Sequence, residues 1–264
     1  LDSEYLLDVR GLTTYFDITE GIVARPIARV HAVEGVTFGI RPGETLSLVG
    51  ESGCGKTTTG RTIIGLEKAT SGEIRFEGKP VTLKSADERR TFCQKVQMIF
   101  QDPYSSLNPR MSIAETLSEP MRVHKLAADR EEIDQRIVDL MNKVNLPPEF
   151  VQRYPHEFSG GQRQRISIAR ALALDPRLII CDEAVSALDV TIKAQVINIL
   201  MDLQEELKLS FLFISHDMAT VERISHRVAV MYLGQIVEIG TREDIFENPT
   251  HSYTKKLLSA VPVA

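Results

Sequence analysis

Eight consecutive residues carry the strongest chemical signal in the chain. The pattern G-x-x-x-x-G-K-[ST] is matched by Gly50-Glu51-Ser52-Gly53-Cys54-Gly55-Lys56-Thr57. Glycines allow successive backbone N–H groups to turn toward phosphate oxygens, and a following helix N-terminus adds positive potential. Lys56 then reaches the β- and γ-phosphates, and the Thr57 hydroxyl ligates Mg²⁺. Because the four fixed positions match by chance in roughly 1% of chains of this length, the loop predicts a nucleotide site.

The sequence also indicates which base this nucleotide carries. A GTPase normally shows N-K-x-D, and the nearest segment, Asn142-Lys-Val-Asn145, lacks the aspartate and lies on a predicted helix. The acidic run Asp182-Glu-Ala-Val185 does not match D-x-x-G either. ATP is therefore the favoured nucleotide.

Two adjacent carboxylates, Asp182 and Glu183, end the apolar run that begins at Leu178. Alternation along a strand sends neighbouring side chains in different directions. We therefore expect Asp182 to face Mg²⁺ or its water shell and Glu183 to act as general base toward the attacking water. Standing alone, such a pair is also typical of solvated acids that cap a strand.

A histidine, His216, follows the apolar run Phe211-Leu-Phe-Ile-Ser215. Ligands gather at the carboxyl ends of strands in open α/β sheets, where an imidazole can hydrogen-bond a γ-phosphate or a water. The other five histidines show no metal-ligand spacing, so we expect surface or core roles for them.

A second helix terminus has an unusual composition. Ser159-Gly160-Gly161-Gln162 opens a helical run, in which Ser159 is a good N-cap and Gln162 completes a capping box. Two adjacent glycines in a first helical turn cost about 1 kcal/mol each relative to alanine. We interpret them as leaving this end bare for an anion. Since the chain already has one phosphate loop, we expect this end to cap a nucleotide held by another copy or a partner domain.

The remaining pattern indicates the elements that position these residues. Strands are predicted at 5–16, 28–40, 46–49, 73–77, 94–100, 177–181 and 210–214, followed by a hairpin over 226–239 with its turn at Gly234. Apolar residues recur at helical spacing from Arg130 to Val144, and the stretch from Asp102 to Glu157 shows no convincing strand. This pattern predicts a strand-and-helix core with an inserted helical subdomain.

Composition excludes several classes of protein. The 264 residues have a formal net charge of −5, so the chain lacks the basic field that drives nonspecific nucleic-acid binding. No apolar run approaches the roughly 18 to 20 residues that cross a bilayer. The three cysteines, Cys54, Cys93 and Cys181, cannot form a disulfide framework. We therefore expect a globular protein of a reducing compartment.

Taken together, the motifs resemble the nucleotide-binding domain of ABC transporters, in order and over almost the whole chain. Residues 50–57 resemble Walker A, Gln101 the Q-loop glutamine, residues 159–162 the signature motif, and residues 178–182 Walker B. Ser186-Ala-Leu-Asp189 resembles the D-loop, and His216 the switch histidine. Phe158 stands where leucine is commoner. For the adenine-stacking aromatic, the resemblance favours Phe16, with Tyr15 as the alternative and core packing as the other interpretation of both.

The resemblance implies roles for named residues. Glu183, His216 and Gln101 are the implied catalytic residues, and Thr57, Gln101 and Asp182 the implied Mg²⁺ ligands. The implied ATP-binding set is Phe16, Gly50, Glu51, Ser52, Gly53, Cys54, Gly55, Lys56, Thr57, Thr58, Ser159, Gly160, Gly161, Gln162 and Asp189. Cys54 lies near a helix N-terminus and Lys56, which predicts a favoured thiolate. The other interpretation is that its position merely tolerates a small residue.

Within the family, the chain is similar to the dipeptide/oligopeptide/nickel importers. Residues 101–110, 153–157 and 248–254 carry this similarity. The segments 29–33 and 214–234 resemble the second ATPase half of a bacterial glutathione importer. A start at Leu1 and an end at Ala264 agree with one ATPase domain of a longer polypeptide.

This resemblance implies an α/β fold: a P-loop NTPase (RecA-like) core, an antiparallel β lobe and an inserted helical subdomain. We expect one ABC ATPase domain over 1–264, with the lobe and core at 1–101 and 159–264 and the helical subdomain at 102–158. ATP hydrolysis would power uptake of peptides, glutathione or di- and oligopeptides among them.

The implied partners are a second ABC ATPase domain in a head-to-tail dimer, two transmembrane permease subunits and, indirectly, a periplasmic solute-binding protein. No nucleic acid is expected. The place of action would be the cytoplasmic face of the bacterial inner membrane, with a coupling helix of the permease received near Tyr104 to Arg110. The alternatives are a soluble ABC ATPase of DNA repair or translation, and a protein that only binds nucleotide.

Overall fold

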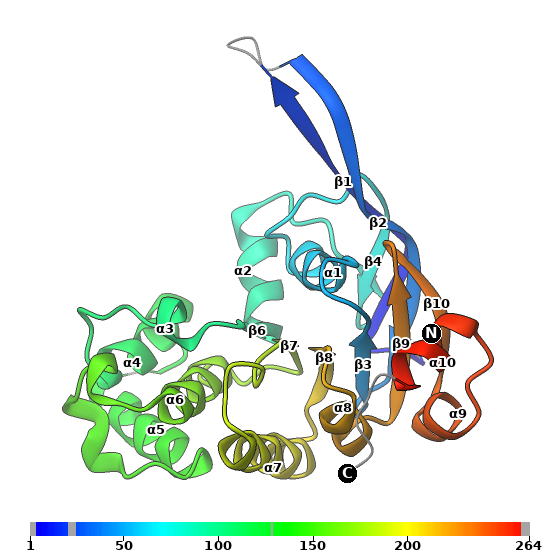
Figure 1. The fold of residues 1–264 in the computed structure, drawn as a ribbon. Coiled ribbons are helices and arrows are strands. Elements are labelled where there is room, and N and C mark those ends of the chain that lie inside the picture. The colour runs from blue at the N-terminus through cyan, green and yellow to red at the C-terminus, as the bar shows by residue number, and fades with distance from the viewer. Residues whose placement is uncertain (1–3, 21–24, 128, 260–264) are drawn as a thin grey trace. The chain divides into compact units, whose positions relative to one another are not determined.

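The structure is a computed structural model that describes residues 4–20, 25–127 and 129–259 (Figure 1). The side chains of residues 19, 20, 25, 26, 104 and 105 lie outside this description. The chain divides into two compact units. The first unit comprises Leu1–Leu83 and Phe211–Ala264, and the second comprises Lys84–Ser210.

The first unit contains an antiparallel sheet in the order β2-β1-β4-β5. Apolar residues of β1 and β2, such as Leu7, Leu12 and Ile40, are fully buried on one face. Farther along, the two strands continue as a long two-stranded ribbon (Figure 1). The bounds are β1 Leu7–Glu20, β2 Arg25–Ile40, β4 Ser71–Phe76 and β5 Lys79–Pro80.

The first unit also contains the strands β10-β9-β3-β8, in this order. β3 runs parallel to both β8 and β9, and β9 forms an antiparallel hairpin with β10. Every residue of β3 and β8 is buried, as expected for near-continuous apolar strands of a parallel sheet. The bounds are β3 Thr45–Val49, β8 Ser210–Ser215, β9 Arg227–Tyr232 and β10 Gln235–Thr241.

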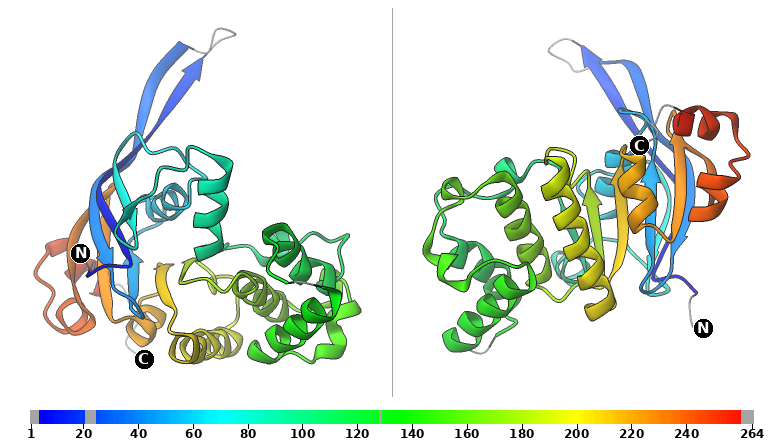
Figure 2. Two further views of the ribbon diagram at one scale, coloured as in Figure 1. Left: turned by 180° about the vertical axis from the view of Figure 1, so that it is seen from behind. Right: turned by 60° about the horizontal axis from the view of Figure 1, so that its bottom comes forward.

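Within the described residues, the first unit contains four helices. α1 follows β3 directly, α8 follows β8, and α9 and α10 follow β10 beside the β9–β10 hairpin (Figure 2). Their bounds are α1 Lys56–Ile63, α8 Met218–Ile224, α9 Arg242–Glu247 and α10 Ser252–Ser259.

The second unit combines two parallel strands with helices. β6 pairs with β7 in parallel, and the described residues between 102 and 158 contain helices and loops without a strand. The bounds are α2 Ala86–Lys95, β6 Val96–Ile99, α3 Pro103–Ser106, α4 Ile113–His124, α5 Arg130–Lys143, η1 Pro148–Gln152, η2 Pro155–Glu157, α6 Gly160–Leu172, β7 Leu178–Asp182 and α7 Val190–Leu207.

Helix α5 shows how local sequence sets an element here. Asp129 is its N-cap and accepts a hydrogen bond from the Glu132 N–H, and Glu131 and Glu132 lie in the first turn, where the helix dipole favours acids. Its buried residues Ile137, Leu140 and Met141 lie at helical spacing, as the sequence predicts, and the helix packs against α4 and α6.

The expected α/β class is confirmed, with its antiparallel lobe and its parallel strands. The compact units divide the chain at residues 83 and 210, whereas the sequence places the helical subdomain at 102–158. The finer division into core and helical subdomain stays a prediction.

The segment between α9 and α10 is held by a single carboxylate. Glu238 of β10 accepts hydrogen bonds from the Thr250 N–H (2.7 Å), the Thr250 hydroxyl (2.6 Å) and the His251 N–H (3.2 Å). Partial burial of Glu238 opposes its ionisation, but these hydrogen bonds outweigh it and lower the pKa of the carboxyl to about 2. The ionised group therefore fixes the chain that leads into α10.

We expect Glu238→Gln to lower the free energy of unfolding at pH 7 by about 1 kcal/mol, because hydrogen bonds to a charged acceptor are lost. A lowered pKa gives stability that is present above the ordinary carboxyl pKa of 4.5 and lost as the pH falls toward 2. The difference between wild type and variant should therefore shrink across that window in urea denaturation.

Glu247→Gln removes an exposed carboxylate of α9 and serves as the control. Equal effects of the two substitutions at pH 7 would contradict the role given to Glu238.

Candidate functional site

The phosphate loop, residues 50–57, joins β3 to α1 in the first unit. Gly50 and Gly55 have φ angles of 151° and 108°, and a Cβ atom would lie 2.2 Å from the Met231 carbonyl oxygen at Gly50 and 2.1 Å from that of Ala32 at Gly55. Backbone oxygens cannot move aside as a flexible side chain can. Only glycine fits both positions, so packing by itself requires the two fixed glycines of the pattern.

Lys56 closes the loop in this structure. Its side chain is buried, and Nζ donates hydrogen bonds to the carbonyl oxygens of Gly50 (2.8 Å) and Glu51 (2.9 Å). The Cys54 N–H also donates to the Glu51 carbonyl, at 3.3 Å. Phosphate oxygens that bind Lys56 compete with these two carbonyls for the ammonium group. Glu51, Ser52 and Gly53 are exposed on the loop, and Thr57 and Thr58 are half-buried.

The expectation that Cys54 favours its thiolate is wrong. Burial raises the pKa of the Cys54 thiol and outweighs the opposing charge of Lys56, whose Nζ lies 3.8 Å from Sγ. The side chain is only 6% exposed. A cation stabilises a thiolate less than desolvation penalises it when the sulfur is enclosed, as it is here against the Gly50 backbone.

Phe16 and Tyr15 lie on opposite faces of β1, and their surroundings differ. Tyr15 stacks on His31 with ring centroids 4.0 Å apart, and its hydroxyl donates to Glu34 at 2.6 Å. This hydrogen bond raises the pKa of Tyr15 and lowers that of Glu34. Phe16 is 39% exposed and its strand partner is Val30. Its part in base stacking stays a prediction.

His216 follows β8 at the same sheet edge as the phosphate loop. β3 and β8 are parallel with Val49 opposite Ser215, so the residues that follow them, Gly50 and His216, leave neighbouring strands at one level. His216 is exposed, and the next residue, Asp217, caps α8. This register brings the predicted histidine beside the predicted loop, which lies 159 to 166 residues earlier in the chain.

The acidic pair lies in the second unit. Asp182, the last residue of β7, is 1% exposed. Glu183 has a φ of 48°, in the left-handed region that non-glycine residues rarely adopt, and Gln101 Nε2 donates to its Oε2 at 2.8 Å. The expected divergence of the two side chains therefore depends on a left-handed turn after the strand, since β7 ends before Glu183 and strand alternation does not extend to it.

The residues after Glu183 support this turn. The Ser186 hydroxyl donates to the Glu183 carbonyl oxygen at 2.9 Å, and the Ser186 N–H donates to the same oxygen at 3.1 Å. Asp189 caps α7 by accepting a hydrogen bond from the Ile192 N–H at 3.0 Å. Its predicted part in nucleotide binding would be added to this capping role.

The capping box of α6 is present. The Gln162 N–H donates to Ser159 Oγ at 3.3 Å, and the Ser159 N–H donates to Gln162 Oε1 at 3.0 Å. A Cβ at Gly161 would lie 2.3 Å from Cγ2 of Ile192 on α7. Packing against α7 therefore accounts for Gly161, which the sequence interpretation assigned to anion access alone.

The candidate Mg²⁺ ligands, Thr57, Gln101 and Asp182, are all oxygen donors, as Mg²⁺ prefers. Across residues 4–20, 25–127 and 129–259, no cluster of three or more His, Cys, Asp or Glu side chains could hold a metal ion.

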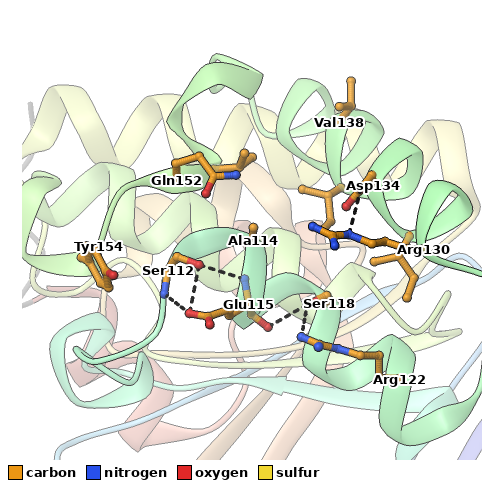
Figure 3. Close-up of a pocket in the computed structure, with 13 residues that line it drawn as sticks. Ser112, Ala114, Glu115, Ser118, Arg122, Arg130, Asp134, Val138, Gln152 and Tyr154 are labelled. Atoms are coloured by element: carbon orange, nitrogen blue, oxygen red, sulfur yellow. Dashed lines mark hydrogen bonds and ion pairs between the residues drawn. The ribbon is translucent and has the colours of Figure 1, made fainter.

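A separate cavity of about 780 Å³ opens among α4, α5 and η1 of the second unit. Figure 3 shows Glu115 bonded to Ser112 at the start of α4, Arg122 bonded to Ser118 farther along, and Arg130 paired with Asp134 on α5. The lining residues, from Ser112 to Tyr154, differ from those predicted to bind nucleotide. The cavity is therefore formed by the helices of the second unit and is not part of the predicted nucleotide site.

Sequence reasoning missed one contact of the phosphate loop. The Glu51 N–H donates to the hydroxyl oxygen of Tyr253, at 3.1 Å, from the first turn of α10. Residues 248–254 carried the similarity to peptide importers, but no motif rule assigns Tyr253 a part in a phosphate site. Only the fold brings it there.

A profile of the ABC transporter family matches residues 33–186. The chain belongs to this family. A second profile, the C-terminal region of oligopeptide/dipeptide transporters, matches residues 237–264, which include α9 and α10. The resemblance seen in the motifs is therefore confirmed for the ABC family.

Several curated ABC relatives are similar over the whole chain. The glutathione import ATP-binding protein GsiA of Escherichia coli (strain K12) is 57% identical over 264 residues, and that of Pectobacterium atrosepticum is 56% identical over 262. These matches cover 100% and 99% of this chain but 42% of each relative. The chain thus spans less than half the length of these relatives.

Solved ABC structures share the fold. The ATP-binding cassette MJ0796, in a dimeric post-hydrolysis state bound to ADP and Pi, has a TM-score of 0.79 and 26% identity, and the match covers 89% of this chain and 98% of that one. CbiO1 from Clostridium perfringens, part of the ABC transporter complex cbiONQ, has a TM-score of 0.79 and 25% identity, with 93% and 92% covered.

We expect Gly161→Ala to destabilise the chain by about 1–2 kcal/mol, because the added methyl group must displace Ile192 and this cost exceeds the gain in helix propensity. The penalty should fall in an Ile192→Ala background, as for residues in contact. Denaturant unfolding of the wild type, the two single variants and the double variant measures the penalty in both backgrounds. If Gly161→Ala is as stable as the wild type, packing does not explain the glycine at this position and ligand binding remains as its explanation.

Proposed function

We propose that this chain is an ATP-hydrolysing domain of an ABC importer. The phosphate loop is the observation that carries the proposal. Its two fixed glycines are locked against neighbouring backbone, and its lysine is directed at the loop's own carbonyl oxygens, ready to exchange them for phosphates. The family membership and the names of the relatives support ATP as the nucleotide.

In the proposed site the adenine stacks on Phe16, and the loop from Gly50 to Thr58 holds the phosphates. Bound Mg²⁺ would neutralise charge on the β- and γ-phosphates, with Thr57, Gln101 and Asp182 as its protein ligands. Glu183 takes a proton from the attacking water, and its hydrogen bond to Gln101 fixes which oxygen faces away from the glutamine. His216 hydrogen-bonds the γ-phosphate.

We further propose that the site is completed by a second ATPase domain. The N-terminus of α6 offers the Ser159 hydroxyl, the glycine backbone at 160 and 161 and the Gln162 side chain to an anion. Asp189 would lie at the same interface. A dimeric state is described for the similar cassette MJ0796, which supports head-to-tail pairing here.

Import is favoured over a soluble role in DNA repair or translation. The match of residues 237–264 to the C-terminal region of oligopeptide/dipeptide transporters supports this choice, as do relatives named for glutathione import. No helix in the described part of the chain is long and apolar enough to span a membrane. We propose that two permease subunits and a solute-binding protein complete the transporter, which this chain joins at the membrane periphery.

We expect Glu183→Gln to retain ATP affinity, to lose at least about a hundredfold in turnover because the general base is gone, and to accumulate an ATP-bound dimer. Phosphate release, equilibrium ATP binding and size-exclusion chromatography measure the three properties. Unchanged turnover would refute the assigned base, and an ATP-bound monomer would count against the shared site.

The cargo can be tested with the complete transporter in vesicles. We expect ATP-dependent uptake of labelled glutathione. Unlabelled di- and oligopeptides should reduce this uptake only if they bind the same solute-binding protein. Lys56→Ala, which removes the phosphate-binding ammonium, should abolish uptake. ATP hydrolysis without uptake of glutathione or of any di- or oligopeptide would refute the peptide assignment and leave the ATPase standing.

A further inference from the structure

The C-terminal helix α10 contacts the phosphate loop through one hydroxyl group. Tyr253, in the first turn of α10, accepts a hydrogen bond from the Glu51 N–H at 3.1 Å, and its side chain is only 8% exposed. Tyr253 lies inside the stretch that matches the oligopeptide/dipeptide transporter region, whereas Glu51 lies inside the general ABC match. The contact thus joins the branch-specific end of the chain to the phosphate loop.

The peptide unit that Tyr253 holds is the one that Lys56 also holds. The N–H of Glu51 and the carbonyl of Gly50 belong to a single peptide unit, and the trans form directs them to opposite edges. Tyr253 binds the N–H edge, and Lys56 Nζ binds the carbonyl edge at 2.8 Å. Rotation of this peptide would break both bonds at once. A hydrogen bond at the N–H also polarises the carbonyl toward a stronger acceptor.

Tyr253 is itself held by two contacts besides its bond to the loop. Its ring packs on Tyr232 at the end of β9, with centroids 4.3 Å apart, and its N–H donates to Nδ1 of His251 at 3.2 Å. Glu238 in turn fixes Thr250 and His251. The hydroxyl is therefore placed by the β9–β10 hairpin and the segment before α10.

The protonation state of Tyr253 suits this role. Burial raises the pKa of its phenol, so the group stays neutral through the physiological range. The ionisable groups that act on it are Glu51, Cys54 and Tyr232. A core tyrosine needs only its ring for packing, whereas this hydroxyl accepts from the backbone of the nucleotide site.

We propose that Tyr253 is a positioning residue of the ATP site, an inference that rests on the proposed function. It fixes the Gly50–Glu51 peptide, so that the loop keeps the shape in which Lys56 and the loop N–H groups receive phosphates. Its loss raises the cost of forming that shape when ATP binds. The effect falls on ATP affinity rather than on the chemical step, because the Tyr253 hydroxyl acts on the Glu51 N–H of the loop and not on a residue assigned to the chemical step.

The test compares Tyr253→Phe with Tyr232→Phe. Each removes one hydroxyl and keeps the ring pair, but only Tyr253 bonds the loop. We expect Tyr253→Phe to weaken Mg·ATP binding and to raise KM about three- to tenfold, the effect of one net hydrogen bond, with kcat within twofold of wild type. Tyr232→Phe should match wild type. Isothermal titration calorimetry and steady-state phosphate release supply these values.

Tyr253→Phe with wild-type affinity and KM overturns the inference, and so does a loss confined to kcat. If Tyr253→Phe unfolds at a lower temperature than the wild type, amide hydrogen exchange at Glu51 is measured at a temperature at which both Tyr253→Phe and Tyr232→Phe are folded. Faster exchange at Glu51 than in Tyr232→Phe supports the contact, and equal exchange overturns it. If the wild-type chain binds no ATP, the proposed function is refuted as well. If the wild type binds ATP and Tyr253→Phe binds it with the same affinity, this inference alone is refuted.

Discussion

The close approach of the phosphate loop to two backbone carbonyls is the constraint on which the arrangement of the first unit depends. Gly50 lies against Met231 of β9 and Gly55 against Ala32 of β2, at distances that exclude any side chain. Two hydrogen bonds continue this packing: Gly234 donates to the Cys54 carbonyl, and Glu34 donates to the Gly234 carbonyl. The β9–β10 turn is thereby fastened to the loop on one side and to β2 on the other. Because β2 pairs with β1, the same contacts set where Phe16 lies relative to the loop. The loop and the strand that carries Phe16 are thus positioned by backbone packing, which no side-chain rotation can loosen.

In the second unit, the comparable constraint is the left-handed turn at Glu183. A non-glycine residue at positive φ costs of order 1 kcal/mol or more and persists only where its surroundings hold it. Here Ser186 binds the Glu183 carbonyl twice and Gln101 binds its carboxylate. The strand before the turn is fully buried, so Asp182 stays enclosed while the backbone turns Glu183 away from it. Two chemically similar carboxylates thereby come to occupy different environments, as a metal ligand and a general base require.

Much of this organisation could be predicted from residue patterns. The buried runs at β3, β7 and β8 and the helical spacing of α5 were found at nearly their observed bounds, because apolar periodicity reflects burial directly. Three predictions at the level of single residues were wrong or incomplete. Cys54 has a raised rather than a lowered pKa because enclosure outweighs the lysine charge. Gly161 makes room for Ile192, and the separation of Asp182 from Glu183 depends on a turn rather than on strand alternation. Each of these three observed features depends on neighbours that are distant in sequence, or on backbone angles that composition does not specify.

The sequence by itself determined the family, the α/β class and the identity of the phosphate loop, because these rest on local spacing and on burial patterns. The tertiary structure alone decided that Tyr15 stacks on His31 and bonds Glu34, both of which come from another strand. It also decided that Tyr253 bonds Glu51, which lies 202 positions earlier in the chain. The physical reason is the same in both cases. A hydrogen bond or a stacked ring needs atoms within a few ångströms, and only the pairing of strands such as β3, β8 and β9 brings such distant segments together.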